Sequence, residues 1–415
     1  METKAKLDYK KTFILGFGFF AISLVWPLYN VYVPLYLEKF ISSSTIIGAI
    51  MTIDNILAIF LIPFISNLSD NTRTRFGRRM PFILIGLPLS AVLFIILPST
   101  TNSFLMMMIV LTVLNFVMAI YRGPTVALMP DLTPPELRSE ANGIINFMGG
   151  LAAVVVLIGG SFMYKVNPGL PFWVTGIIML FSLFMLFKFI KEPARGEKSA
   201  EEKVKVIQSV KDIISNSDNK TLNVLLGILF WFLGYQGMEA MFSRYSVNYL
   251  GVGDGGDSSL IIGVFALSFL IFAIPAGFLG AKIGKKKAII IGLSVDILVF
   301  ITLSLMGPGN VIPFNKTLMM GLFLIGGIFW ACVNINSYPY VVQGVGENKV
   351  GTYTGLYYFS SSIAAITGPI IFGFFVDLFG FSRLFVIVVI SFAIALFFIT
   401  RIKSKVVEVI WKKTA

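Results

Sequence analysis

The chain has 415 residues, of which 56% are hydrophobic and 13% are charged, and its formal net charge is +12. Soluble domains carry about 25% charged residues, so this composition indicates a protein that crosses a lipid bilayer many times. The basic residues gather in loops on alternate sides of the apolar segments, so the positive charge does not indicate a nucleic-acid partner. One cysteine and no histidine exclude an internal disulfide and a zinc cluster, and we expect neither a metal nor a cofactor.

Twelve apolar windows along the chain reach about 20 residues, the length that a helix needs to span a bilayer. The sequence therefore predicts an all-α membrane protein with twelve transmembrane helices. Because there is no histidine, a group that exchanges protons near neutral pH must be a carboxylate. The twelve windows are 12–37, 45–68, 81–98, 103–129, 139–164, 170–190, 221–250, 258–281, 287–307, 316–344, 350–377 and 381–401.

Clusters of lysine and arginine distinguish the two sides of the membrane. They occupy the N-terminus, the loop after the second window, the central loop, the loop after the eighth window and the C-terminus. The loops on the other side carry single basic residues such as Lys39 and Lys165. Since loops rich in Lys and Arg stay in the cytoplasm, we expect both termini to be cytoplasmic. The short C-terminal tail and the low cysteine content fit a bacterial inner membrane.

The central loop divides the chain into two sets of six helices. We expect a first six-helix bundle over 1–191, a cytoplasmic linker over 192–220 and a second bundle over 221–415. Apolar residues recur at helical spacing within the linker, from Val204 to Ile214. They predict an amphipathic helix on the membrane surface, and a solvated linker is the alternative.

The two halves repeat each other weakly, and several of the corresponding positions are 212 residues apart. Ala141–Ile144 corresponds in this way to Tyr353–Leu356, and Pro63 corresponds to Pro275. Transporters built from two such repeats bind their solute near the middle of the membrane, between the halves. The sequence therefore predicts a transporter with a central binding site.

A polar loop from Asp70 to Pro81 separates the second and third windows and holds four arginines. In this loop Asp70 closes one helix, Gly77 permits a sharp reversal, two arginines follow, and Pro81 opens the next helix. This order is more specific than positive charge alone. The alternative is an ordinary basic loop of the kind found in any multi-span membrane protein.

Two motifs in the first half carry a family resemblance. The motif residues are Ser69-Asp70, Arg73, Arg75–Arg79 and Pro81–Ile83 in the first motif, and Arg122–Pro124, Ala127-Leu128, Asp131-Leu132 and Pro135–Arg138 in the second. With the twelve predicted helices, they make the chain similar to the major facilitator superfamily. Within it the chain resembles the plant sucrose transporters and their bacterial relatives, neighbours of the glycoside-pentoside-hexuronide cation symporters. The second half matches by topology alone.

The resemblance implies a major facilitator fold of two pseudo-symmetric six-helix halves and a proton-coupled sugar symporter whose halves rock. It also implies that Asp70 meets the start of the eleventh span, near Gly351, when the cytoplasmic side is closed. Plant sucrose transporters carry an Asp in span four that is thought to take the proton, and the corresponding residue here is Asn115. The residues implied as a cytoplasmic gate are Asp70, Arg75, Gly77, Arg78, Arg79, Glu136 and Arg138.

Five ionisable residues stand out as candidates for mid-membrane depth, where a charge is costly and indicates function: Asp54, Arg122, Glu239, Arg244 and Asp296. We predict that Asp54 or Glu239 carries the proton. The alternative for Asp54 is an ion pair with Arg122 that holds the first half together, and protonation of Asp54 that frees Arg122 would combine both roles. Arg244 is expected near the outer end as a gating or snorkelling residue, and Asp296 in a structural role or a hydrogen bond between helices.

Polar and aromatic residues cluster on the first, fourth, seventh and tenth spans, which line the cavity in the superfamily that the chain resembles. Aromatic rings stack on sugars and amides bond sugar hydroxyls, whereas packing inside the bundle is the alternative for each aromatic residue. A guanidinium suits vicinal hydroxyls because it offers several donors in a fixed fork. The candidate binding residues are Trp26, Tyr29, Asn30, Asn55, Asn115, Arg122, Gln236, Glu239, Trp330, Asn334, Asn336 and Tyr338.

The function that these features favour is proton-coupled symport of a sugar, such as the oligosaccharides sucrose or maltose, by alternating access. An exporter of apolar drugs or metabolites and a sodium-coupled sugar symporter are the alternatives within transport. A sensor that binds without transporting is the alternative outside it. We do not expect an enzyme, because the sequence has no histidine, no thiol pair and no G-x-S-x-G turn. The expected partners are the solute, protons and the lipid bilayer, and the chain is expected to work as a monomer.

Overall fold

The computed structural model of the chain describes residues 6–192, 219–346 and 349–402. Within these residues, twelve helical segments are long and apolar enough to cross a membrane. The prediction of an all-α membrane protein with twelve spanning helices is therefore confirmed. The amphipathic helix expected between Val204 and Ile214 lies outside the described residues.

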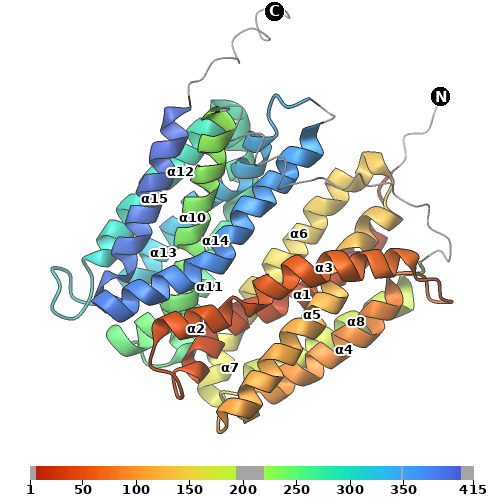
Figure 1. Cartoon of the computed structure of the whole chain (residues 1–415), viewed down its shortest axis with the longest axis horizontal. Helices are drawn as coiled ribbons and strands as arrows, with labels where there is room; N and C mark the ends of the chain where they lie inside the picture. Colours follow the sequence, from red (N-terminus) through yellow and green to blue (C-terminus); the bar gives the residue numbers. More distant parts are fainter. Residues whose placement is uncertain (1–5, 193–218, 347–348, 403–415) are drawn as a thin grey trace, which may run out of the picture.

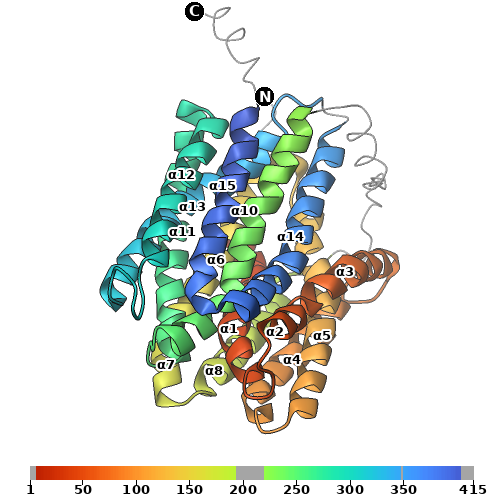
Figure 2. The same cartoon turned by 60° about the vertical axis from the view of Figure 1, so that its left-hand side comes forward.

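The helices form two groups, with α2 of the first group reaching across to one end of α14 in the second (Figure 1 and Figure 2). The first group consists of α1 (Tyr9–Leu37), α2 (Ser44–Met51), α3 (Ile53–Asn71), α4 (Met80–Ile96), α5 (Phe104–Leu132), α6 (Arg138–Val154), α7 (Gly160–Val166) and α8 (Leu170–Phe189). The second group consists of α10 (Asn219–Arg244), α11 (Gly255–Ile283), α12 (Lys285–Ser304), α13 (Lys316–Val341), α14 (Val350–Phe379) and α15 (Leu384–Arg401).

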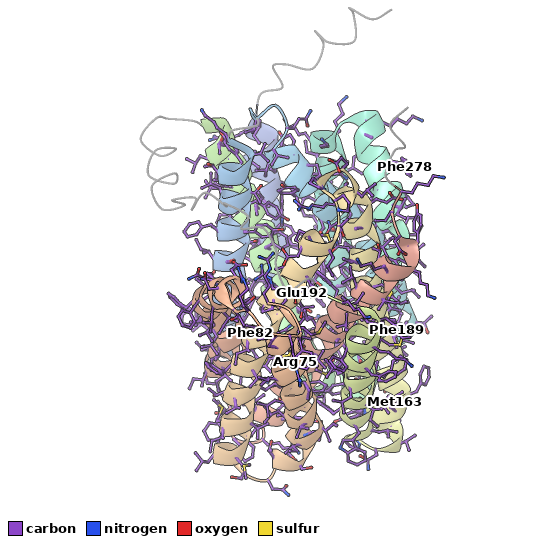
Figure 3. The ribbon with its side chains drawn as sticks, turned by 90° about the vertical axis from the view of Figure 1, so that its right-hand side faces the viewer. Arg75, Phe82, Met163, Phe189, Glu192 and Phe278 are labelled. Carbon is purple, nitrogen blue, oxygen red and sulfur yellow. The ribbon has the colours of Figure 1, made fainter. Side chains whose placement is uncertain are left out.

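Each group has a hydrophobic core of its own. The first core runs from Leu15 to Ile190 and the second from Val224 to Ile402. Large apolar side chains also cover the outside, as does Phe278, which is 73% exposed and lies at the edge of the bundle in Figure 3. Helices that are apolar on all sides are typical of a bundle immersed in lipid.

Three spans of the described chain are interrupted inside their length by a break or a π-helical turn. The second span is broken at Thr52, where φ of −95° and ψ of −4° separate α2 from α3 and the hydroxyl donates to the carbonyl of Ala49 (2.8 Å). Wide π-helical turns interrupt the fifth span at Val155–Gly159 and the seventh at Tyr245–Tyr249. The apolar window 45–68 does not show this break, because neither Gly nor Pro marks it. Such irregular turns are frequent at functional sites.

Successive spans run in opposite directions, so the arginine-rich loop after the second span, the turn before Lys285–Lys287 after the eighth and Arg401 at the end of the twelfth lie on one side of the bundle. We call this side the basic end, and the other the opposite end. Figure 1 shows the N-terminal and C-terminal groups of helices from one side. At the basic end, Lys286 donates to the carbonyl oxygen of Ile402 (2.5 Å) at the end of α15. Favourable placement of a cation at a helix C-terminus explains this contact.

Two buried arginines organise the basic end of the first group. Arg78 and Arg79 both bind the carboxylate of Asp131, with N–O distances of 2.6 and 2.9 Å. Arg79 also pairs with Asp70, which lies nine residues earlier in the last turn of α3. The predicted reversal at Gly77 is confirmed by its φ of 105°. These interactions join α3, α4 and α5 to one another.

The other predicted gate residues lie around this network. Arg75 stacks on the neighbouring Phe76 ring (4.6 Å), and Arg138 donates to the carbonyl oxygens of Pro130 (3.0 Å) and Thr133 (3.2 Å). Glu136 is exposed. Among the described residues, Asp70 makes no hydrogen bond or ion pair with the start of α14, so its predicted meeting with that helix in a closed state stays a prediction.

Glu192 completes the network from the first position of the expected linker. Its carboxylate accepts from the backbone N–H groups of Arg79 (2.8 Å) and Met80 (3.0 Å), which begin α4. N–H groups in the first turn of a helix have no partner within it, so Glu192 serves as a cap supplied from a distant part of the chain. Figure 3 places Glu192 at the same end of the first group as Arg75.

Replacing this cap should lower stability. In Glu192→Ala the two N–H groups lose their acceptor in a buried site, which costs about 1–3 kcal/mol. We expect a lower thermal unfolding midpoint in detergent, with partial recovery in Glu192→Gln, which keeps one acceptor oxygen. Glu136→Ala, which removes an exposed carboxylate nearby, is the matched control and should melt like the parent. Equal midpoints for Glu192→Ala and the parent would contradict the capping role.

Candidate functional site

A polar cavity of about 250 Å³ lies between the two helix groups. Both groups supply its walls, so it lies where the repeat architecture predicts a binding site. The residues that line it are Trp26 and Asn30 of α1, Met51 of α2, Asp54 and Asn55 of α3, Arg122 of α5, Gln236, Glu239 and Ala240 of α10, and Ala365 and Pro369 of α14.

The break in the second span places two polar side chains in this cavity. Asp54 and Asn55 come two and three residues after Thr52 and occupy the first turn of α3. The amide of Asn55 donates to Asp54 Oδ1 (2.9 Å). A carboxylate in the first turn of a helix is stabilised by the partial positive charge of the helix N-terminus. Discontinuous helices are a common way for transporters to expose such a helix end to a solute.

Glu239 faces the first group from α10. Its Oε1 accepts a hydrogen bond from the amide of Asn30 (3.1 Å), so this bond joins the two groups inside the cavity. Gln236 lies three residues earlier and lines the same wall, as the predicted helical spacing requires. Each group therefore contributes one carboxylate to one cavity.

Arg122 provides the positive charge of the site. Its guanidinium lies 6.0 Å from the ring centre of Trp26, within the range of a cation–π contact. Among the described residues, no ion pair within 4.0 Å joins Arg122 to Asp54, so the alternative of a direct Asp54–Arg122 bridge is not realised in this structure. The indole N–H of Trp26 is buried and has no hydrogen-bond partner in the described part of the chain. Both groups are therefore available to a solute.

Two candidate residues lie behind the cavity wall. Tyr29 is 1% exposed and Asn115 is 3% exposed, and the amide of Asn115 donates to the Tyr29 hydroxyl (3.2 Å). The Tyr29 ring packs edge-on against Trp26 at 5.7 Å. Neither residue lines the cavity, so the structure gives them contacts that support Trp26 from behind.

The candidates on α13 lie outside the cavity lining. Trp330 stacks on Tyr235 at 4.7 Å. The hydroxyl of Tyr338 lies 3.0 Å from that of Thr354. The remaining α13 candidate is Asn334, which is half-buried.

Asn336 is directed away from the cavity. Its amide donates to the carbonyl oxygens of Ala276 and Cys332, both at 3.0 Å. A Cβ at Gly280 would lie 1.7 Å from its Oδ1, so this side chain fills the space where α11 and α13 cross. These contacts give Asn336 a packing role between helices.

The two other ionisable residues within spans have separate environments. Arg244 lies at the opposite end and pairs with Glu38 of the first group (2.9 Å). Asp296 is 1% exposed inside the second group, and neither carboxylate oxygen has a hydrogen-bond partner among the described residues. The hydrogen bond between helices that was considered for Asp296 is not made there.

The cavity residues that sequence reasoning missed are mainly apolar. Met51, Ala240, Ala365 and Pro369 carry no chemical signal of their own. Pro369 in the eleventh span does indicate a local irregularity of the helix, because proline removes a backbone donor. In the described residues, no group of three or more His, Cys, Asp or Glu side chains could hold a metal ion. The lining offers carboxylate, amide, indole and guanidinium groups for hydrogen bonds.

Comparisons with known proteins agree with this architecture. The family model of the Major Facilitator Superfamily matches residues 15–369 and 254–411. The class H tetracycline resistance protein of Pasteurella multocida is 23% identical over 365 residues, which cover 85% of this chain and 84% of that protein. The isoprimeverose transporter of Lactiplantibacillus pentosus is 23% identical over 323 residues, which cover 71% and 64%.

Solved structures show the same fold. The nucleoside transporter NupG superposes with a TM-score of 0.70 at 15% identity, over 96% of this chain and 100% of that chain. A bacterial homolog of the human lysosomal transporter Spinster, solved in an inward-facing and unoccupied conformation, superposes with a TM-score of 0.74 at 13% identity, over 95% and 97%. With a family model that matches most of its length, the chain belongs to the major facilitator superfamily.

Proposed function

We propose that this secondary transporter imports a sugar together with protons. The observation that carries the proposal is the cavity itself, in which Asp54 of one half and Glu239 of the other meet among amide, indole and guanidinium donors. A sugar presents many hydroxyls that both donate and accept hydrogen bonds. Asn30, Asn55 and Gln236 supply both functions, and the carboxylates supply further acceptors.

The size of the cavity favours a small solute. Sites for drug-sized ligands occupy about 300–1,000 Å³, and this cavity has a volume of about 250 Å³. One sugar ring stacked on Trp26 suits this space, with Arg122 bonded to vicinal hydroxyls. An oligosaccharide such as sucrose or maltose would extend further along the opening between the halves.

Proton coupling follows from the position of Glu239. Its ionised form accepts the Asn30 hydrogen bond across the halves. Protonation of Glu239 would weaken this bond, because hydrogen bonds to a charged acceptor are about twice as strong as neutral ones. Asp54 remains the second candidate, since it shares the cavity and is bonded only to Asn55 among the described residues.

In this proposal the basic end faces the cytoplasm of a bacterial cell, in keeping with the positive-inside rule. The described hydrogen bonds and ion pairs between the halves lie in the cavity or at the opposite end, which supports a state that is open at the basic end. The segments 1–191 and 221–415 would act as two rocking halves joined by the linker 192–220. A single chain contains the complete cavity, which supports a monomer.

A second candidate function is export of a drug or metabolite. It is favoured by the tetracycline resistance proteins of Pasteurella multocida and Escherichia coli, which match 85% and 90% of this chain. The polar lining of the cavity argues against an apolar cargo, because buried polar groups that lose water need new partners. Sodium-coupled sugar import is a third arrangement, and replacement of sodium by choline in an uptake assay distinguishes it from proton coupling.

We expect proteoliposomes that contain the protein to accumulate a labelled sugar when an inward proton gradient is imposed. Glucose, sucrose and maltose would be compared, and accumulation should collapse when the gradient is removed. Asp54→Asn or Glu239→Gln should abolish gradient-driven accumulation, since neither amide takes up a proton near neutral pH. Asp296→Asn, which neutralises a buried acid outside the cavity, is the matched control and should accumulate like the parent. Undiminished accumulation in both cavity variants would rule out the proposed coupling.

We also expect the cavity amides to contribute directly to solute binding. Gln236→Ala removes one hydrogen-bonding group, worth about 0.5–1.5 kcal/mol, so Kd should rise by roughly two- to tenfold. Titration calorimetry on the purified protein measures this change. Asn334→Ala removes the same kind of group from α13, outside the cavity lining, and should leave Kd unchanged. A larger effect of Asn334→Ala than of Gln236→Ala would place the solute elsewhere.

A further inference from the structure

The halves meet at the opposite end through two crossings that the internal repeat makes equivalent. Where α2 crosses α14, a Cβ on Gly373 would lie 2.3 Å from the carbonyl oxygen of Ser44. Where α7 crosses α11, a Cβ on Gly256 would lie 2.7 Å from the carbonyl oxygen of Ser161. Ser44 and Gly256 are 212 positions apart, and so are Ser161 and Gly373. The same close backbone contact therefore occurs twice.

The polar groups around the two crossings differ. At the first crossing, Asp377 of α14 accepts four hydrogen bonds from the start of α2. They come from the Ser43 hydroxyl (2.7 Å), the Ser44 N–H (2.6 Å), and the N–H (2.9 Å) and hydroxyl (2.7 Å) of Thr45. Asp377 thus caps a helix of the other half with a negative charge, which the helix dipole favours.

Arg244 of α10 holds the same segment. It is 4% exposed, and its Nε and Nη1 donate to Glu38 (2.9 Å) and to the Ser44 hydroxyl (2.8 Å). Asn248 also donates to Glu38 (2.8 Å). These partners all belong to the first half, so separation of α2 from α14 breaks the contacts together. We call Asp377, Arg244 and their partners the α2 latch.

The second crossing carries a different charged pair, beside one neutral hydrogen bond between the halves from the Ser259 hydroxyl to the carbonyl oxygen of Leu157 (2.8 Å). Lys165 of α7 lies 2.8 Å from Asp257 of α11, and these positions correspond in the repeat to Asp377 and Thr45. Lys316, which belongs to the same half as Asp257, lies 2.5 Å from the same carboxylate oxygen. When the halves separate, Asp257 keeps Lys316, and Lys165, already 48% exposed, passes into water. We call Lys165 and Asp257 the α11 latch.

We propose that closure of the opposite end is asymmetric, with the α2 latch holding the halves together and the α11 latch releasing at little cost. Lys165 and Asp257 form a partly exposed ion pair, a class that contributes little to stability. Asp377 is also exposed, but its charge accepts four hydrogen bonds at once, and the bond from Arg244 to Ser44 beside them is buried. The population of the state that is open at this end is therefore set by Asp377 and Arg244. This inference concerns the closure alone and holds whichever solute is carried.

Distances between spin labels test the proposal without any solute. Leu105 belongs to the first half and Val311 to the second, and both lie at the opposite end, where they are 71% and 82% exposed. Spin labels on Leu105→Cys and Val311→Cys, in a Cys332→Ala background, report the distance between the halves at that end. In Asp377→Ala the ratio of long to short distances should rise about tenfold or more. In Lys165→Ala, the matched removal of one charge from the other latch, the ratio should change less than about twofold.

A steric pair of variants gives an independent test. A Cβ on Gly48 of α2 would lie 2.2 Å from the carbonyl oxygen of Pro369, so Gly48→Ala should also favour the long distance. A Cβ on Gly159 would meet nothing within 4 Å, so Gly159→Ala is the control and should leave the ratio unchanged. If Asp377→Ala yields no folded protein, the same distance ratio is measured in Asp377→Asn and Gly48→Ala instead. An equal change of the distance ratio in the Asp377 and Lys165 variants would overturn the proposal. So would a population with only short distances in both Asp377→Asn and Gly48→Ala.

Discussion

The second membrane span belongs to both halves at once, and the arrangement of the cavity depends on this. Its first part, α2, packs against α14 of the second half, whereas its second part, α3, packs against α5 of the first half. The break at Thr52 lets the chain change direction between these two partners. It also turns a helix N-terminus, with Asp54 in its first turn, toward the cavity. Irregular backbone at this depth is tolerated in a membrane protein where it borders a polar cavity.

Hydropathy and loop charge were sufficient to predict the number of spans and the place of the reversal at Gly77. These features depend on composition averaged over many residues, or on a backbone conformation that glycine adopts most readily. The break at Thr52 could not be predicted in the same way. No Gly or Pro marks it, and the interruption arises from packing against helices far away in the sequence. The cavity lining of Asp54, Glu239 and Gln236 was partly predicted, because helical spacing puts Gln236 and Glu239 on one face.

Helix rotation explains the candidate residues that the structure places elsewhere. Asn334 and Asn336 are close in sequence, but Asn336 fits against Gly280 and bonds backbone carbonyls, which fixes the orientation of α13. A sequence shows that an amide lies within a span but does not show which neighbour is small enough to receive it. The sequence also did not show which residue pairs with Arg244, because Glu38 is about two hundred positions away and belongs to the other half.

The charges of the cavity have an electrical consequence. Two carboxylates and one guanidinium give the lining a formal charge of −1 when both acids are ionised, and of zero once one proton is bound. Under proton coupling, the loaded carrier reorients as a neutral unit and the empty carrier as an anion. A membrane potential that is negative inside then drives the return of the empty carrier, by about 2.3 kcal/mol per charge for each 100 mV. Arg122 thereby determines which half of the transport cycle responds to voltage.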